Sequence, residues 1–274
     1  MTRRLVLTAD DLGREQGTSV EIARLAAEGA ITASTVIVVA PGADVAASAV
    51  ARAGVAPRLH ATLSSERGLA AWRPVRTAAS LVSDEGTLPF DPAEVGARAD
   101  AADVAAELEA QLQRLLGWGI RPLALDSHAG TLYGLTGRPF IAEALELASR
   151  HGLGFRLPRD PALYLGGALP AAAAALHASG VAAADALGVP IPAAIATNRM
   201  PAAQLGGYEG LRDGYLRILG ALPEGTSEIF MHPAPEHAVA GPDGIVRTWE
   251  LALLRDDRFR AAIDAEGIEL VDGW

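Results

Sequence analysis

Short apolar segments of strand length alternate with longer amphipathic segments along the chain, and no other feature limits the fold as strongly. The segments of strand length are 5–8, 32–40, 58–62, 122–126, 154–157, 193–197, 228–232 and 268–271. The segments of helical length are 15–29, 43–53, 93–117, 138–151, 201–220 and 247–265. Such alternation predicts parallel strands that are joined by right-handed helical crossovers.

The number of these repeats favours a barrel. The clearest helix is 93–117, where Val104, Leu108, Leu112 and Leu115 form one apolar stripe on a charged segment. Eight or so strand–helix repeats suit a closed or nearly closed barrel, and a doubly wound sheet is the alternative. Because α/β barrels of about 250 residues are common as single domains, we expect residues 1–274 to form one catalytic domain. Its fold class is α/β, a single-domain (β/α) barrel-like fold that is irregular or incompletely closed.

The composition of the chain excludes or disfavours several classes of function. The chain has 33 acidic and 23 basic residues, a formal net charge of -10, which disfavours nucleic acids and anionic membranes as partners. It has no cysteine, so thiolate metal sites and cysteine nucleophiles are excluded. The alanine-rich tract 166–190 is too polar for a membrane span and predicts a helical hairpin or lid. Because the first residues lack the apolar run of a signal peptide, we expect a cytoplasmic protein.

Several predicted strands end in residues that can bind metals or transfer protons. In a parallel α/β barrel the carboxyl ends of all strands open on one face, where active sites are built. Four separate regions of the sequence would therefore meet in one pocket. The residues at these ends are Asp10, Asp11, His60, Asp126, His128 and His232.

These residue types indicate a catalytic metal site. Two adjacent carboxylates near a core repel each other unless a cation compensates them. Asp11, His60 and His128 would supply one oxygen and two nitrogens and leave positions for water and substrate. Asp10 would then remain free as a general base.

Each motif also has an ordinary structural explanation. Asp10 and Asp11 fit a turn with a helix N-cap, and a lone His60 fits a structural histidine. The other histidines, His151, His177 and His237, are assigned no role. A serine hydrolase is disfavoured because the chain has no Gly-x-Ser-x-Gly turn, and nucleotide-binding glycine motifs are absent as well.

Together the motifs resemble those of the YdjC/ChbG-type carbohydrate deacetylases. The segment 8–13, Thr-Ala-Asp-Asp-Leu-Gly, is similar to the N-terminal motif of that family, and 59–63 is similar to its His-x-x-Leu motif. Residues 125–128 match its Asp-Ser-His segment, and 231–233 are similar to a C-terminal His-Pro. The motifs occur in the family's order across nearly the whole chain. The chain departs from the family in Leu12, which replaces an aromatic residue, and in 129–132, which lacks further histidines.

The resemblance implies a barrel-like α/β fold and hydrolysis of the acetamide of an N-acetylated amino sugar or oligosaccharide. It also implies that Asp11, His60 and His128 hold the metal, in agreement with the residues themselves. Asp10 would take the proton of the attacking water, and His232 would protonate the departing amine. Asp126 would orient a ligand histidine, and Arg156 would contact sugar hydroxyls or a substrate anion, with a plain salt bridge as its alternative.

Other functions stay open at this stage. One divalent metal ion is expected, with Zn²⁺ preferred because two imidazoles suit it and with Mg²⁺ as the alternative. A carbohydrate-binding protein without turnover would keep the pocket, but it would not need a spare carboxylate beside a metal ligand. A metal-dependent isomerase or lyase would use the same barrel. The partner is a small-molecule or oligosaccharide substrate, and a homodimer is a further option.

Overall fold

The computed structural model describes residues 2–274, and it contains a strand at each of the eight predicted positions. The bounds differ from those predicted by at most four residues at either end. The strands are β1 (Arg3–Leu12), β2 (Ala33–Val36), β3 (Pro57–Ala61), β4 (Ala124–Ser127), β5 (Gly154–Phe155), β6 (Ile195–Ala196), β7 (Gly225–Met231) and β8 (Glu269–Leu270).

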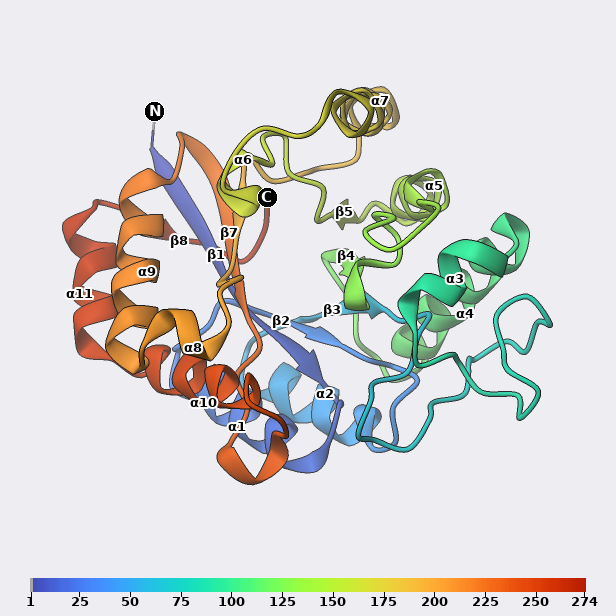
Figure 1. Cartoon of the computed structure of the whole chain (residues 1–274), viewed down its shortest axis with the longest axis horizontal. Helices are drawn as coiled ribbons and strands as arrows, with labels where there is room; N and C mark the ends of the chain where they lie inside the picture. The colour runs from blue at the N-terminus through green and yellow to red at the C-terminus, as the bar shows by residue number, and fades with distance from the viewer. Residues whose placement is uncertain (1) are drawn as a thin grey trace.

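All strand pairs in the sheet are parallel. Seven strands follow the order β5-β4-β3-β2-β1-β7-β6, and β8 pairs with the amino-terminal part of β1. The long central strand β1 contacts β2 through its carboxyl-terminal half and β7 along Arg3 to Ala9. The sheet curls so that its carboxyl ends surround one region, with helices outside it (Figure 1). This confirms the barrel-like α/β fold.

The barrel is incompletely closed between β5 and β6. These two strands do not pair with each other, and a few backbone hydrogen bonds from β5 and the segment after it to the segment before β6 bridge the gap. Arg159 N–H donates to the carbonyl of Pro192 and Asp160 N–H to that of Ala193, both at 2.9 Å. Few backbone hydrogen bonds span this gap. Side chains and the segment around 160–190 therefore cover this side of the barrel.

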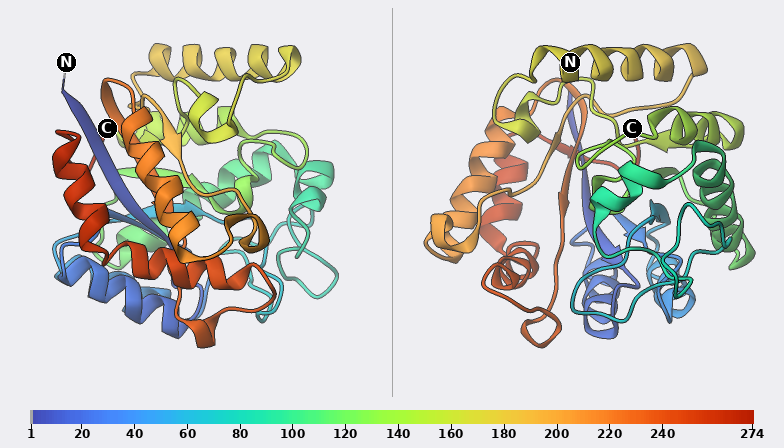
Figure 2. Two further views of the ribbon diagram at one scale, coloured as in Figure 1. Left: turned by 60° about the vertical axis from the view of Figure 1, so that its left-hand side comes forward. Right: turned by 45° about the vertical axis from the view of Figure 1, so that its right-hand side comes forward.

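Helices cover the outside of the sheet (Figures 1 and 2). They are α1 (Gln16–Ala27), α2 (Ala43–Arg52), α3 (Pro92–Arg98), α4 (Ala101–Gly117), α5 (Ile141–His151), α6 (Ala162–Leu165), α7 (Ala171–Leu187), α8 (Ala202–Leu205), α9 (Tyr208–Ala221), α10 (Gly244–Leu253) and α11 (Asp257–Ala265). Two 3-10 turns, η1 (His128–Gly130) and η2 (Glu236–Ala238), follow β4 and β7. The predicted apolar stripe lies on α4, and its four residues are all buried.

Three of the predicted helices are each two helices, so those predictions were wrong in extent. The segment 93–117 divides at Asp100, whose carboxylate accepts from Ala102 N–H and begins α4. The segment 247–265 divides in the same way at Asp256, which accepts from Arg258 N–H. In 201–220 the break is at Gly206 and Gly207, which have φ of 70° and 136°. Capping side chains and glycines in these conformations end helices that the apolar pattern would continue.

The alanine-rich tract forms α7 as one helix, and not as a hairpin. It is the outermost helix of this end of the molecule (Figure 2), and only Gly180 and Ala184 in it are buried. Its first half reaches a cavity through Ala173, Leu176 and His177. Movement of α7 as a lid stays a prediction. No helix among residues 2–274 is both long and apolar enough to cross a membrane.

Candidate metal centre

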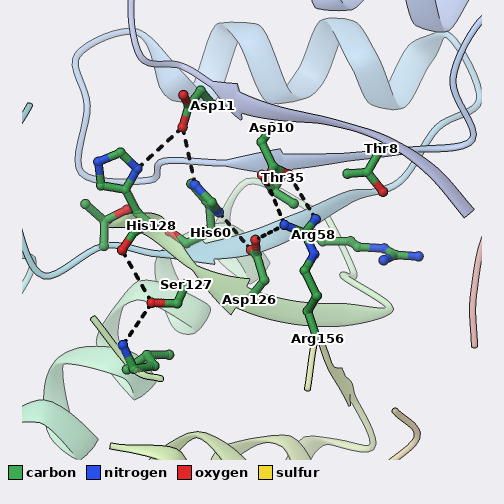
Figure 3. Close-up of polar contacts among 12 residues, drawn as sticks. Thr8, Asp10, Asp11, Thr35, Arg58, His60, Asp126, Ser127, His128 and Arg156 are labelled. Carbon is green, nitrogen blue, oxygen red and sulfur yellow. Dashed lines mark hydrogen bonds and ion pairs between the residues drawn. The ribbon is translucent and has the colours of Figure 1, made fainter. Parts of the chain in front are cut away.

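The carboxyl ends of the strands bring the predicted site residues together. Asp10 and Asp11 end β1, His60 lies in β3 and Asp126 lies beside it in β4, where the two are register partners. His128 directly follows β4, as Figure 3 shows. The remaining two site residues follow neighbouring strands: Arg156 follows β5, which pairs with β4, and His232 follows β7, which pairs with β1.

Three side chains converge as the ligands of one ion would. Asp11 Oδ1 lies 3.3 Å from His60 Nε2 and 3.4 Å from His128 Nδ1, and the three ligand atoms all lie within 4.8 Å of one another. Two atoms that are each about 2.1 Å from a tetrahedral ion are roughly 3.4 Å apart. Asp11 Oδ1 is also buried without a hydrogen-bond donor. The residues therefore fit a divalent cation, which would satisfy this oxygen.

The hydrogen bond of His60 to Asp126 leaves Nε2 of its ring available to bind such an ion. Its Nδ1 is 2.8 Å from Asp126 Oδ1, and a proton on Nδ1 would leave the lone pair of Nε2 directed to Asp11 and His128. Burial alone would lower the pKa of His60, but Asp126, Asp11 and Asp10 outweigh burial and raise this pKa to about 10. The site therefore attracts positive charge strongly.

A second group of potential ligands, Asp10, His60 and Asp126, also lies within reach of one ion. Here the Arg156 guanidinium already occupies the space between the carboxylates. Its Nη1 lies 2.7 Å from Asp10 Oδ2 and 2.5 Å from Asp126 Oδ2. Since a cation is already present there, the Asp11 group is the better candidate for the metal.

Asp10 is held by Arg156 and Thr35. Arg156 donates from Nη1 and Nη2 at 2.7 and 2.9 Å, and the Thr35 hydroxyl donates at 2.8 Å. Burial raises the pKa of Asp10, but the charge and hydrogen bonds of Arg156 outweigh burial and bring this pKa to about 2. Asp10 is therefore ionised at neutral pH and its orientation is fixed.

Arg156 is surrounded by buried carboxylates. It is 3% exposed and lies among Asp10, Asp126 and Glu228, whose Oε1 is 2.7 Å from Nη2. Its terminal nitrogens are committed to carboxylates, which favours the salt-bridge alternative. Arg156 also borders the cavity, and its contact with a sugar stays a prediction. Glu228, which the sequence analysis did not single out, is fully buried and also accepts from the Thr8 hydroxyl at 2.6 Å.

His232 lies beside Asp10 because β7 pairs directly with β1. The register places Met231 opposite Ala9, and His232 Nε2 is 4.0 Å from Asp10 Oδ2. About a third of the His232 side chain is exposed, whereas Asp10 is buried. The imidazole therefore lies between the buried carboxylate and the cavity, where it can contact a bound molecule.

Two further features were missed by the sequence analysis. Arg247 in α10 donates from Nη1 to Asp11 Oδ2 at 2.6 Å. Asp11 itself has φ of 70°, a left-handed conformation that is uncommon for residues other than glycine and that often marks functional sites. The Asp-Asp-Leu-Gly segment gave a hint of this turn, but no pattern in the sequence links Arg247 to residue 11.

A cavity of about 870 Å³ opens over these residues. The metal-centre side of its wall includes Asp11, His60, His128 and His232. Another part of the wall comes from α6, α7 and the segment around 195–199, and it combines apolar side chains such as Leu165 and Leu176 with polar ones such as Asn198. His177, to which the sequence analysis assigned no role, also lines the cavity, and its Nε2 is 2.7 Å from the Pro158 carbonyl oxygen. The volume is typical of a site for a small ligand.

The fold and this geometry define a barrel-like α/β protein with a candidate metal centre at the carboxyl ends of its strands. The model of the YdjC-like protein family matches residues 4–265, and the chain belongs to this family. A carbohydrate deacetylase of Geobacillus stearothermophilus is 32% identical over 130 residues. That match covers 47% of this chain and 50% of the relative, so it spans only about half the length of either.

Solved structures share the fold. A protein of Enterococcus faecalis that is named for cellobiose-phosphate cleavage has a TM-score of 0.77 at 21% identity, over 99% of this chain and 98% of that one. A lactam utilization protein of Thermus thermophilus has a TM-score of 0.50 at 17% identity, over 97% and 98%. At these identities the likeness describes the fold alone.

Proposed function

We propose that the chain is a metal-dependent hydrolase that removes acetyl groups from N-acetylated amino sugars or their oligosaccharides. The observation that carries the proposal is the convergence of Asp11, His60 and His128 beside an ionised Asp10 at the floor of the cavity. Membership in the YdjC-like family and the carbohydrate deacetylase relative support the same substrate class.

In this proposal Asp11, His60 and His128 hold one divalent ion, and Asp126 keeps His60 in the required tautomer. The bound ion would supply Lewis acidity for the acetyl carbonyl and for the attacking water. Two imidazole nitrogens and one carboxylate oxygen favour Zn²⁺ over Mg²⁺, which prefers oxygen ligands.

The protein's own groups would handle the protons. Asp10 is ionised at neutral pH and accepts the proton of the attacking water at Oδ2, which faces His232. A carboxylate with so low a pKa holds a proton only briefly, so Asp10 would give it to the nearby His232, which would pass it to the departing amine. Arg156 would act on Asp10 by fixing its orientation.

Acetate release is the direct test of this function. Protein that is freed of metal and reloaded with Zn²⁺ or Mg²⁺ should release acetate from N-acetylglucosamine oligomers, and His128→Ala should not. Sugar binding without acetate release would favour the carbohydrate-binding alternative. Conversion of a sugar without acetate release would favour an isomerase or lyase. A homodimer and a cytoplasmic location stay predictions.

A further inference from the structure

The two carboxylate oxygens of Asp11 have different surroundings. Oδ1 faces His60 and His128 and receives no hydrogen bond. Oδ2 receives a short hydrogen bond from Arg247 Nη1 at 2.6 Å. The side chain of Asp11 is 2% exposed, and its backbone has the left-handed conformation described above. The orientation of this carboxylate is therefore imposed by its neighbours.

Arg247 is itself held in place from several segments. Its Nη2 is 3.8 Å from Glu66 Oε1, and Arg14 binds both oxygens of Glu66 at 2.6 Å. Arg14 in turn donates to the carbonyl of Ala238 at 3.1 Å. Residues that follow β1, β3 and β7 thus fix the guanidinium that α10 supplies. Arg247 also borders the cavity and is 24% exposed.

We propose that Arg247 is a positioning residue that occupies Asp11 Oδ2, so that Asp11 offers only Oδ1 to the metal. A carboxylate with two free oxygens can bind an ion through both of them. The guanidinium removes that option and thereby keeps the coordination number low, so that the ion can still accept water or substrate, as a catalytic site requires. The inference rests on the metal site of the proposed function.

Cobalt provides a readout that does not depend on activity. Visible absorption bands of protein-bound Co²⁺ weaken as the coordination number rises, so they report whether Asp11 binds through one oxygen or two. In Arg247→Met we expect a loss of band intensity relative to wild type, whereas Arg247→Lys, which keeps a cationic donor, should retain the wild-type bands. Arg199→Met is the matched control, because Arg199 also lines the cavity but hydrogen-bonds to the Tyr164 carbonyl and not to Asp11.

The affinity of the variants for Co²⁺ distinguishes a positioning role of Arg247 from a general structural role. Removing a cation close to the ion and freeing a second oxygen should leave Co²⁺ bound at least as tightly in Arg247→Met as in wild type. A site that was merely loosened would bind Co²⁺ more weakly and keep its bands. Competition with a chromophoric chelator measures this affinity.

The cobalt experiment also requires that Arg247→Met folds. If Arg247→Met does not fold, Arg247→Ala is measured with and without added guanidinium ion, which should restore the wild-type bands. Unchanged bands in folded Arg247→Met or Arg247→Ala would overturn the proposal, and unchanged bands in these two variants with a raised KM would assign Arg247 to substrate binding instead. If wild type binds no Co²⁺ in a one-to-one ratio, the metal site and the proposed function fail with it.

Discussion

Replacement of Arg156 by methionine removes the cation that lies among three buried carboxylates. Asp10, Asp126 and Glu228 all contact its guanidinium within 3 Å, and their side chains are at most 3% exposed. Loss of one partner from a buried ion pair costs about 3–5 kcal/mol, because the remaining charge is left unpaired in the interior. At about 2–4 °C per kcal/mol for a domain of this size, the melting temperature should fall by roughly 6–20 °C.

The matched control for this variant is Arg159→Met. Arg159 is three residues further along the chain and pairs with Asp185 at 2.7 Å, but the two side chains are 47% and 55% exposed. Such a pair contributes about 0–1 kcal/mol. Calorimetry of the metal-free proteins measures both variants. The reasoning is refuted if Arg156→Met loses no more stability than Arg159→Met.

The stability difference between wild type and Arg156→Met should depend on pH in a definite direction. In wild type the pKa of Asp10 is lowered from 3.8 to about 2, so the stability that its ionised form contributes is present above pH 3.8. That stability is lost as the pH falls from 3.8 through about 2. The stability difference between wild type and Arg156→Met should therefore be largest near neutral pH and shrink over this window, as urea unfolding at several pH values can measure.

Three further predictions concern the metal and the proton transfers. Asp11→Asn should lose the metal, whereas Asp10→Asn should keep it and lower kcat by roughly 10²-fold or more. Measurements of metal content and acetate release check both variants. The reverse result would exchange the roles of metal ligand and general base between the two residues. Asp126→Asn should weaken metal binding roughly 10- to 100-fold, as measured against a chelator, because the partner of His60 loses its negative charge. His232→Ala should lose activity and alter the high-pH limb of the kcat/KM profile, so full activity with an unchanged limb would make His232 a turn residue.

The positions of the strands could be predicted because a buried parallel strand is a short apolar run, and each run stands between turn residues. The ends of the helices could not, because they depend on local competition. Asp100 and Asp256 begin new helices by accepting hydrogen bonds from the backbone, and an apolar stripe does not report this. The register was also hidden, so the sequence did not indicate that Glu228 points to the interior.

The site residues that could be predicted all follow or end strands, since parallel strands bring their carboxyl ends together. The residues that were missed act from the interior of a strand or from a helix, where an arginine or glutamate usually faces solvent. Arg247 is such a case, since it lies in α10 and its contact with Asp11 spans 236 positions of the sequence. Only the three-dimensional structure could show that contact.

The balance of buried charge shows why this centre could accommodate a further cation. The carboxylates of the centre outnumber its guanidiniums by one. The carboxylates are Asp10, Asp11, Asp126 and Glu228, and the guanidiniums are Arg58, Arg156 and Arg247. A proton on His60 compensates this excess in the absence of metal, which accounts for the pKa of about 10 at this imidazole. A divalent ion would replace that proton, so metal binding and the protonation of His60 exclude each other.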